Sequence, residues 1–238
     1  MREAQRFFED KAAAYRGSKS HGNVEDLARM VACLRPKRGA LALDVATGGG
    51  HTARALAEAG CRVVATDATR GMLSGLPVGE AVLSDALAMP FRDARFDVVA
   101  CRIAAHHFFG PEIFCAEAAR VLKPGGALYV FDLTSPEDAA QAEVVNHIER
   151  LRDPSHGWSF EPSRWRAAVD TAGLALETLE TRTSAFDLAP WIERAQMLPE
   201  RERALRTVLD ARPDLGGYGL DDTGKMRVLR VELLARKT

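Results

Sequence analysis

Short apolar runs that close on or near a polar residue recur along the first half of the chain. Strong helix formers lie between them, as in Arg54–Ala59 and Glu112–Leu122, and a Lys-Pro-Gly-Gly segment ends the second of these helices. The predicted strands cover Ala40–Asp44, Cys61–Asp67, Ala81–Leu83, Phe96–Ala104 and Ala127–Asp132. This alternation predicts an α/β fold, a mostly parallel sheet with helices on both faces and right-handed crossovers.

The N-terminal segment departs from the alternation. Residues 3–34 are helical in pattern and are broken at Gly17–Gly22, with apolar faces formed by Phe7, Phe8, Ala12 and Tyr15 and by Val24, Leu27, Met30 and Val31. Because these helices precede the first strand, we expect residues 1–35 to form a lid over a ligand crevice. The alternative is that the aromatic residues only hold the segment against the core.

The second half is less regular. Helical stretches within residues 135–166 are interrupted at Asp153–Gly157, and a further helix covers Trp165–Ala172. Two β-rich stretches, Leu174–Thr183 and Met226–Arg236, enclose residues 186–222. We expect a single domain over residues 1–238, with residues 135–166 and 186–222 as insertions on the substrate side.

Composition narrows the class of partner. The 238 residues are 47% hydrophobic and carry a formal charge of −1, which gives no overall attraction to nucleic acid or an anionic membrane. A small-molecule partner is therefore favoured. The four cysteines lack Cys-x-x-Cys spacing, and no apolar run approaches the ~20 residues of a membrane span. We expect free thiols and a cytoplasmic protein, either a monomer or a homodimer.

Candidate chemistry begins at the turn after the first predicted strand. Gly48, Gly50 and Ala53 fit a dinucleotide-type glycine turn, whose backbone a cofactor can approach closely. Asp67 follows Gly50 by 17 residues and ends the next strand, where a carboxylate can accept hydrogen bonds from ribose hydroxyls. The alternatives are a glycine turn without a ligand, and a helix-capping or turn role for Asp67.

These motifs resemble those of the class I S-adenosylmethionine-dependent methyltransferases. Leu43–Gly50 is similar to their D-x-G-x-G-x-G motif, with Ala46 at the first glycine position, as in the ubiquinone/menaquinone C-methyltransferase branch. Ser84–Phe91 is similar to G-D-A-x-x-L-P-F, and Phe96–Val99 and Leu122–Gly126 complete the set. The resemblance runs from about Glu25 onward and implies a Rossmann-like, doubly wound sheet of seven strands with an antiparallel last strand.

The resemblance also implies a cofactor and its site. S-adenosylmethionine would bind and S-adenosylhomocysteine would be the product, with Asp67 at the ribose and Asp85 and the Ala86 backbone at the adenine. The predicted cofactor-binding residues are Tyr15, Asp44, Ala46, Gly48, Gly50, Asp67, Ala68, Met72, Asp85, Ala86 and Arg102. Cys101–Phe108 and Asn146–His156 further resemble a bacterial subgroup of small-molecule methyltransferases, so the acceptor itself stays unidentified.

Histidines are the candidate catalytic residues. His106 or His107 is predicted to act as a general base, with His147 and His156 as second candidates, because histidine titrates in the working range. Alternatively, the pair caps the next helix or packs against Phe108 and Phe109. No metal site is expected, since adjacent side chains on an extended segment diverge.

Methyl transfer to a small-molecule acceptor is the leading function. The glycine spacing and Asp67 also fit an NAD(P)-dependent oxidoreductase, and a non-catalytic S-adenosylmethionine-binding module is a third possibility.

Overall fold

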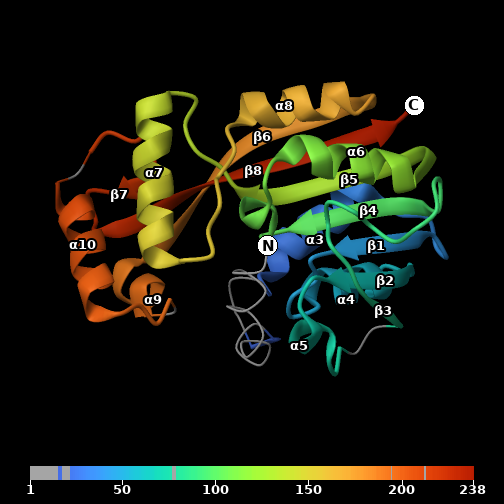
Figure 1. The fold of residues 1–238 in the computed structure, drawn as a ribbon, viewed down its shortest axis with the longest axis horizontal. Coiled ribbons are helices and arrows are strands. Elements are labelled where there is room, and N and C mark those ends of the chain that lie inside the picture. The colour runs from blue at the N-terminus through green and yellow to red at the C-terminus, as the bar shows by residue number, and fades with distance from the viewer. Residues whose placement is uncertain (1–15, 18–21, 77–78, 194, 212) are drawn as a thin grey trace.

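A computed structural model describes residues 16–17, 22–76, 79–193, 195–211 and 213–238. Its strands form one sheet in the order β3-β2-β1-β4-β5-β8-β6, and a two-residue strand, β7, pairs beside β8 (Figure 1). The bounds are β1 Leu41–Val45, β2 Arg62–Asp67, β3 Glu80–Leu83, β4 Phe96–Arg102, β5 Leu122–Leu133, β6 Leu174–Asp187, β7 Gly219–Leu220 and β8 Lys225–Lys237.

Strand direction follows the expected pattern. β1 to β5 pair in parallel, whereas β8 runs antiparallel to both of its neighbours, β5 and β6. The prediction of a mostly parallel, Rossmann-like sheet with an antiparallel last strand is confirmed. The short β7 was not predicted.

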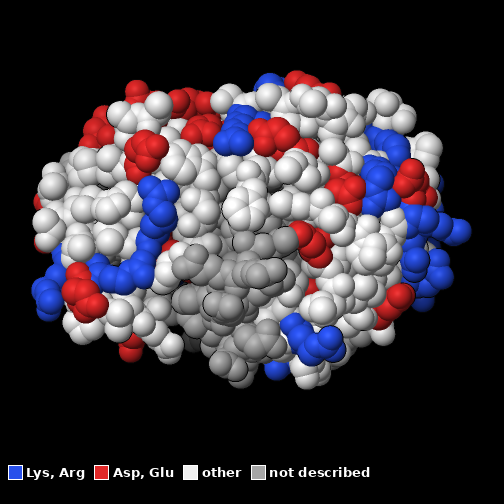
Figure 2. Space-filling view, viewed as in Figure 1, with Lys and Arg blue, Asp and Glu red and all other residues white. Residues whose placement is uncertain are grey.

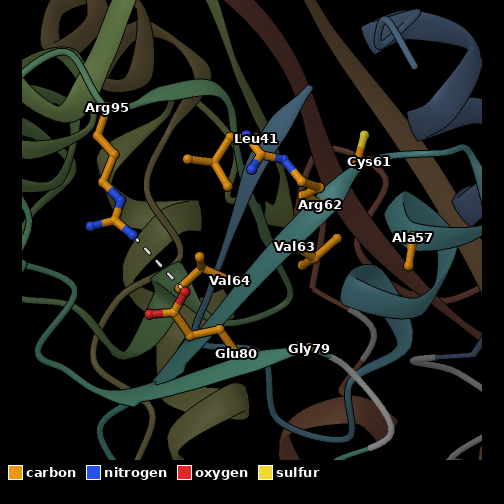
Figure 3. A pocket seen from close by; sticks show the side chains of 9 residues that line it. All are labelled: Leu41, Ala57, Cys61, Arg62, Val63, Val64, Gly79, Glu80 and Arg95. Carbon is orange, nitrogen blue, oxygen red and sulfur yellow. Dashed lines mark ion pairs between the residues drawn. The ribbon is translucent and has the colours of Figure 1, made fainter. Parts of the chain in front are cut away.

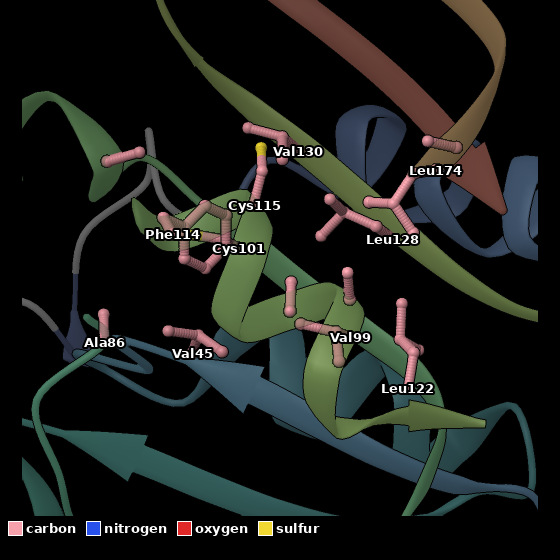
Figure 4. Packing of buried hydrophobic residues seen from close by; sticks show 14 of the residues in the cluster. Val45, Ala86, Val99, Cys101, Phe114, Cys115, Leu122, Leu128, Val130 and Leu174 are labelled. Carbon is pink, nitrogen blue, oxygen red and sulfur yellow. The ribbon is translucent and has the colours of Figure 1, made fainter. Parts of the chain in front are cut away.

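Helices cover both faces of the sheet. The bounds are α3 Val24–Leu34, α4 His51–Glu58, α5 Arg70–Leu73, α6 Pro111–Val121, α7 Ala139–Arg152, α8 Pro162–Thr171, α9 Leu188–Glu193 and α10 Pro199–Asp210, with a 3₁₀ turn, η1, over Ala105–His107. Side chains of α6 and α8 pack on one face, as Figure 4 shows for Phe114 and Cys115 beside Val130. Side chains of α3 and α4, including Met30 and Leu56, pack on the other.

A third apolar core lies apart from these two. It joins α7, α9, α10, β7 and the outer ends of β6 and β8, with Ile148, Trp191, Leu205 and Tyr218 among its buried residues. We call this group of elements the cap. It lies on the left of Figure 1, beyond one end of the sheet. β6 and β8 reach it because they continue pairing past β5, which ends opposite Arg230.

Some local predictions were wrong. Val24, predicted on the apolar face of its helix, is 78% exposed, whereas Met30 and Leu34 carry the buried contact of α3. The segment after α6 is not a separate turn: β5 begins at Leu122, and a bulge at residues 123–126 lets Ala127 pair with Val98. The first β-rich stretch, predicted over Leu174–Thr183, forms β6 and continues to Asp187 because it pairs with β8 along its whole length.

The state of the cysteines and the distribution of surface charge agree with what the composition predicts. All four cysteines are free thiols, as expected. Acidic and basic side chains are interspersed over the face of the molecule in Figure 2, consistent with the formal charge of −1. Among the helices that the structure describes, none combines the length and apolar character needed to cross a membrane.

Candidate active site at the carboxyl edge of the sheet

The carboxyl ends of the parallel strands meet at one edge of the sheet, which we call the carboxyl edge. Two non-glycine residues just past these ends adopt left-handed backbone, Ala46 after β1 and Ile103 after β4, each with φ 54°. This conformation costs about 1–2 kcal/mol per residue, and such strain clusters at functional sites. Because glycine adopts left-handed backbone without this cost, a glycine would suit the position of Ala46. β1 and β4 are neighbours, so both irregularities lie side by side.

The loop after β1 is fixed by short-range hydrogen bonds. Thr47 donates its hydroxyl to Asp44 Oδ2 at 2.6 Å and its backbone N–H to Thr66 of β2 at 2.7 Å. Gly48 and Gly50 have φ of 50° and 79°, and Gly50 is the N-cap of α4. Burial raises the pKa of Asp44 to about 7, although the Thr47 hydroxyl lowers it. The predicted strand, glycine turn and helix are confirmed.

Asp67 links this loop to the next one. Its Oδ2 accepts a hydrogen bond from Gly48 N at 3.0 Å, and its Oδ1 accepts one from Thr69 N at 2.9 Å. Burial raises the pKa of Asp67 and these two bonds oppose the shift. The helix-cap alternative is wrong, because Thr69 is the N-cap of α5, whereas the turn role is present. The Thr69 side chain and the Ala68 backbone N–H also lower the pKa of Asp67 by hydrogen bonding, so this carboxylate holds the loops after β1 and β2 together.

The remaining predicted cofactor residues of β2 and β3 lie around Asp67. Met72 in α5 and Ala86 after β3 are buried, and Ala68 is half-buried next to Asp67 in the chain. Asp85 is also half-buried, and its Oδ1 accepts a hydrogen bond from Leu87 N at 2.9 Å. The structure therefore brings the acids of β1, β2 and β3 to one side of the carboxyl edge. Tyr15 lies outside the described residues.

Arg102, the last residue of β4, joins the edge to the N-terminal helix α3. Its buried side chain has Nη2 3.9 Å from Asp26 Oδ2 and its guanidinium 5.6 Å from the centre of the Phe131 ring. Burial lowers the pKa of Arg102, and Asp26 and Asp44 are among the groups that raise it. α3 is therefore held against the strand ends that the predicted lid would cover.

A histidine–aspartate pair lies past the end of β4. His106 Nδ1 is 2.6 Å from Asp132 Oδ1, and Asp132 Oδ2 accepts hydrogen bonds from the backbone N–H of Ala104, at 3.0 Å, and of Ala105. Burial raises the pKa of Asp132, but His106 and the backbone N–H groups of Ala104 and Leu133 hold it well below its usual value. Nδ1–H of His106 therefore donates to the carboxylate, and within the described residues Nδ1 is the ring nitrogen that forms a hydrogen bond.

The other two clustered histidines are held neutral. His107 Nδ1 donates to the Ser155 carbonyl oxygen at 2.9 Å, and burial and His106 lower its pKa to about 4. His156 Nε2 lies 2.8 Å from Asn146 Oδ1, and its ring stacks on His106 with 5.5 Å between centroids. Burial and the neighbouring histidines lower the pKa of His156 to about 2.

Several expectations for the histidines need correction. His106 and His107 lie in η1 rather than on an extended segment, and their ring centroids are 4.1 Å apart rather than diverging. They do not cap the next helix, because Gly110 is the N-cap of α6, and Phe109 is 73% exposed. His147 is exposed on α7, away from the cluster. Among the described residues, no group of three or more His, Cys, Asp or Glu could hold a metal ion.

Two members of this network were missed as site residues. Asp132 was predicted only as the end of a strand, and Asn146 only as part of a family segment. Asp132 shared one signal with Asp44 and Asp67, an acid that ends a buried apolar run, and that signal identifies it. Asn146 has no such signal, because its fully buried position depends on how α7 packs.

A pocket of 440 Å³ lies at the opposite edge of the sheet. Its lining includes the first residues of three strands, Leu41, Arg62 and Glu80, with Glu80 paired to Arg95 at 3.9 Å (Figure 3). None of the predicted site residues lines it. The polar groups of the carboxyl edge, rather than this pocket, define the candidate site.

The fold is that of the methyltransferases, as comparisons with known proteins show. Residues 43–130 match the family described as methyltransferase domain. The chain belongs to this family, since it is 32% identical over 216 residues to the uncharacterized methyltransferase YcgJ of Bacillus subtilis, covering 87% of this chain and 85% of that one. The family decides against the NAD(P)-dependent oxidoreductase.

More distant and structural relatives extend this result. The ubiquinone biosynthesis O-methyltransferase of Xylella fastidiosa (strain 9a5c) is 30% identical over 176 residues, covering 68% of this chain and 70% of that one. The crystal structure of YcgJ has a TM-score of 0.82 and 29% identity, covering 90% of this chain and 98% of YcgJ. A Bacillus halodurans structure assigned to the methyltransferases has the same TM-score at 35% identity, covering 90% and 99%.

Proposed function

We propose that this protein transfers the methyl group of S-adenosylmethionine to a small-molecule acceptor at the carboxyl edge. The observation that carries the proposal is the Asp67 carboxylate, which joins the loops after β1 and β2 at the carboxyl edge, where dinucleotide-type folds place the acid that binds the ribose. Membership of the methyltransferase family supports the same reaction.

The chemistry of the residues present fits this cofactor. Asp67 would hold the ribose hydroxyls, and Asp85 with Ala86, Ala68 and Met72 would surround the adenine. Asp44, Ala46, Gly48 and Gly50 would form the turn beneath the methionine portion, where left-handed backbone at Ala46, Gly48 and Gly50 turns the chain away from the ligand. Arg102 would supply positive charge on the β4 side.

The cofactor, when bound, supplies a methyl group already activated by its sulfonium. The protein needs to bind and orient the two reactants and to exclude water. Where the acceptor must lose a proton, His106 would accept it at Nε2, because Asp132 fixes the hydrogen on Nδ1. The neutral rings of His107 and His156 beside it would avoid adding a fixed positive charge.

The cap and α3 would complete the site. The cap elements α7, α9 and α10 lie beyond the carboxyl edge, and the loop that follows α7 contacts His106 through Gly157 N and Trp158 N. We therefore assign residues 135–166 and 186–222 to the acceptor side of one methyltransferase domain. α3 would border the cofactor site, and the rest of the predicted lid, residues 1–15 and 18–21, lies outside the described residues.

Calorimetry with S-adenosylhomocysteine and NAD tests the cofactor assignment. We expect micromolar or tighter binding of S-adenosylhomocysteine and none of NAD. Tighter binding of NAD than of the sulfur ligand would refute the proposal.

The histidine role is tested by comparing His106→Gln with the exposed control His147→Gln. Once an acceptor that loses a proton is in hand, His106→Gln should lose about 10²–10⁴-fold in turnover at unchanged cofactor affinity. Equal turnover in the two variants would mean that positioning alone accounts for the rate.

A further inference from the structure

Arg230 of β8 occupies a position that the reaction described above does not use. Its register partner is Leu133, the last residue of β5, so it lies at the carboxyl edge. Arg102 of β4 is opposite Phe131 of β5, which is opposite Glu232 of β8. Residues paired across strands share a sheet face, as do positions two apart on one strand, so Arg102, Phe131 and Arg230 lie on the same face.

One guanidinium nitrogen of Arg230 is buried without a hydrogen-bond partner in the part of the chain that the structure describes. The residue is 8% exposed, and its Nη1 atom is buried with no hydrogen-bond partner among the described residues. None of the ion pairs found within the described part of the chain includes it. Its ring contact is with Phe131, at 5.9 Å from guanidinium carbon to ring centre. A buried cation left in this way is unfavourable unless something else pairs with it.

The carboxylates around Arg230 are already bound to other groups. Glu232 accepts hydrogen bonds from Tyr129 at 2.9 Å and Arg182 at 2.5 Å. Glu149 of α7 accepts one from Tyr218 at 2.9 Å and has Arg152 at 3.6 Å.

The carboxylates of Asp132 and Asp26 also interact with groups other than Arg230. Asp132 holds His106 and three backbone N–H groups, and Asp26 lies 3.9 Å from Arg102. Burial lowers the pKa of Arg230, and Asp132 of β5, Glu149 of α7 and Asp26 of α3 raise it through space. Side chains from the sheet, the cap and the N-terminal helix therefore all act on this guanidinium.

We propose that Arg230 binds an oxyanionic group of the methyl acceptor, a carboxylate or a phosphate. A guanidinium presents paired N–H donors that match such groups in a bidentate way. The inference rests on the proposed function, because it names the substrate class of the same site.

The cofactor's own carboxylate is a second source of this chemistry, and the sheet order argues against it. The charge of Asp44, in the loop assigned to the cofactor, raises the pKa of Arg102. Arg230 lies on β8, two strands beyond β4, which corresponds to about 9–10 Å at normal strand spacing. Arg230 therefore serves the acceptor rather than the cofactor.

The test compares Arg230→Met with Arg227→Met, a matched control on the exposed part of the same strand. Benzoate, inorganic phosphate and the neutral benzamide are titrated by ligand-observed NMR, with and without S-adenosylhomocysteine. We expect at least one oxyanion to bind the natural protein and Arg227→Met equally, and Arg230→Met at least tenfold more weakly. Benzamide should bind at least tenfold more weakly than benzoate if benzoate is the oxyanion that binds.

Thermal unfolding separates a binding role from a structural one. Without ligand, Arg230→Met should unfold about 2–4 °C higher, since it removes an unpaired buried charge and keeps the apolar stem. A lower midpoint would show that Arg230 supports the fold and would overturn the proposal. So would the absence of oxyanion binding to the natural protein, or oxyanion binding that does not depend on Arg230.

The affinity for S-adenosylhomocysteine shows whether the oxyanion that Arg230 binds belongs to the acceptor or is the cofactor's own carboxylate. Affinity for S-adenosylhomocysteine should change less than twofold in Arg230→Met. A tenfold loss there would assign Arg230 to the cofactor's carboxylate and overturn the acceptor role. If S-adenosylhomocysteine bound neither the variants nor the natural protein, the proposed function would fail. The oxyanion titrations done without S-adenosylhomocysteine would still show whether Arg230 binds an oxyanion.

Discussion

The carboxyl edge has two halves that are built differently. The half that we assign to the cofactor, after β1, β2 and β3, is held by bonds between close neighbours in the chain, such as Thr47 to Asp44 and Gly48 to Asp67, 19 residues apart. The half that we assign to the acceptor, around β4, β5, β8 and the loop after α7, joins residues from Ala104 to Arg230. We call these the cofactor half and the acceptor half. One strand-helix-strand unit can therefore shape the first half, whereas the second half needs the whole fold.

The two halves also differ in how their acids are satisfied. Asp67 accepts hydrogen bonds from the backbone of Gly48 and Thr69, and the groups that bind it come from its own loop and the loop after β1. Asp132 is fully buried and spends its acceptors on His106 and on the N–H groups of Ala104, Ala105 and Leu133. In the proposed site, Asp67 would therefore act on a ligand directly, whereas Asp132 would act through His106.

The largest effect should come from breaking the acceptor half at Asp132. Asp132→Ala leaves His106 and three backbone N–H groups without their acceptor, so we expect a loss of about 3–5 kcal/mol in the free energy of unfolding. Urea unfolding measures it, with Asp67→Ala as the comparison variant, since the groups bound to Asp67 all belong to the neighbouring loops after β1 and β2 and do not include a buried histidine. Equal losses in the two variants would contradict the difference drawn between the halves.

The next effect concerns Asp44 and its dependence on pH. The folded-state pKa of Asp44 is raised from 3.8 to about 7, so the folded chain keeps a proton that the unfolded chain releases. Its contribution to stability therefore falls as pH rises between about 4 and 7, by up to about 1.4 kcal/mol per pH unit. Asp44→Asn removes this titration and keeps an acceptor for the Thr47 hydroxyl.

The unfolding free energies of the natural protein and Asp44→Asn should be compared at pH 5, 6 and 7. Their difference should move in favour of the asparagine variant as pH rises, because groups common to both cancel. A difference that stays constant would mean that Asp44 does not titrate in this window.

Asp67 and Asp132 illustrate which parts of the site the sequence could predict. β1, the glycine turn and Asp67 follow from local patterns, because strand, turn and helix signals there involve adjacent residues. The pairing of His106 with Asp132 could not be predicted, since it depends on β4 and β5 ending side by side and on η1 turning the ring back. The apolar run of β8 was predicted, but the isolation of Arg230 arises from partners that other strands give to Glu232.

A smaller effect is expected in the cofactor half, measured as binding. Asp67→Ala should weaken S-adenosylhomocysteine by about 1.5–3 kcal/mol, the range for hydrogen bonds to a charged group. Asp85→Ala should lose less, because the buried Ala86 backbone would share the adenine contact. Calorimetry on folded variants decides the matter, and unchanged affinity in Asp67→Ala would remove the ribose role.

The smallest effect is expected from removing a helix N-cap, either in α3, next to the cofactor half, or in α7, next to the acceptor half. Asn23 caps α3 by accepting a hydrogen bond from Asp26 N at 3.1 Å, and Asp138 caps α7 by accepting one from Gln141 N at 2.9 Å. Each change to alanine should cost its helix about 1 kcal/mol. α3 packs in the core of the sheet, whereas α7 belongs to the separate core of the cap.

A cap with its own core can open without the sheet, since proteins unfold locally in cooperative units. Asp138→Ala should therefore raise hydrogen exchange in α7 by about fivefold, the factor equivalent to 1 kcal/mol, and leave β1 and β4 unchanged. Asn23→Ala is the matched control and should leave α7 exchange unaltered. If Asp138→Ala instead raised exchange throughout the sheet, the cap and sheet would open as one unit, and the acceptor half could not move independently of the cofactor half.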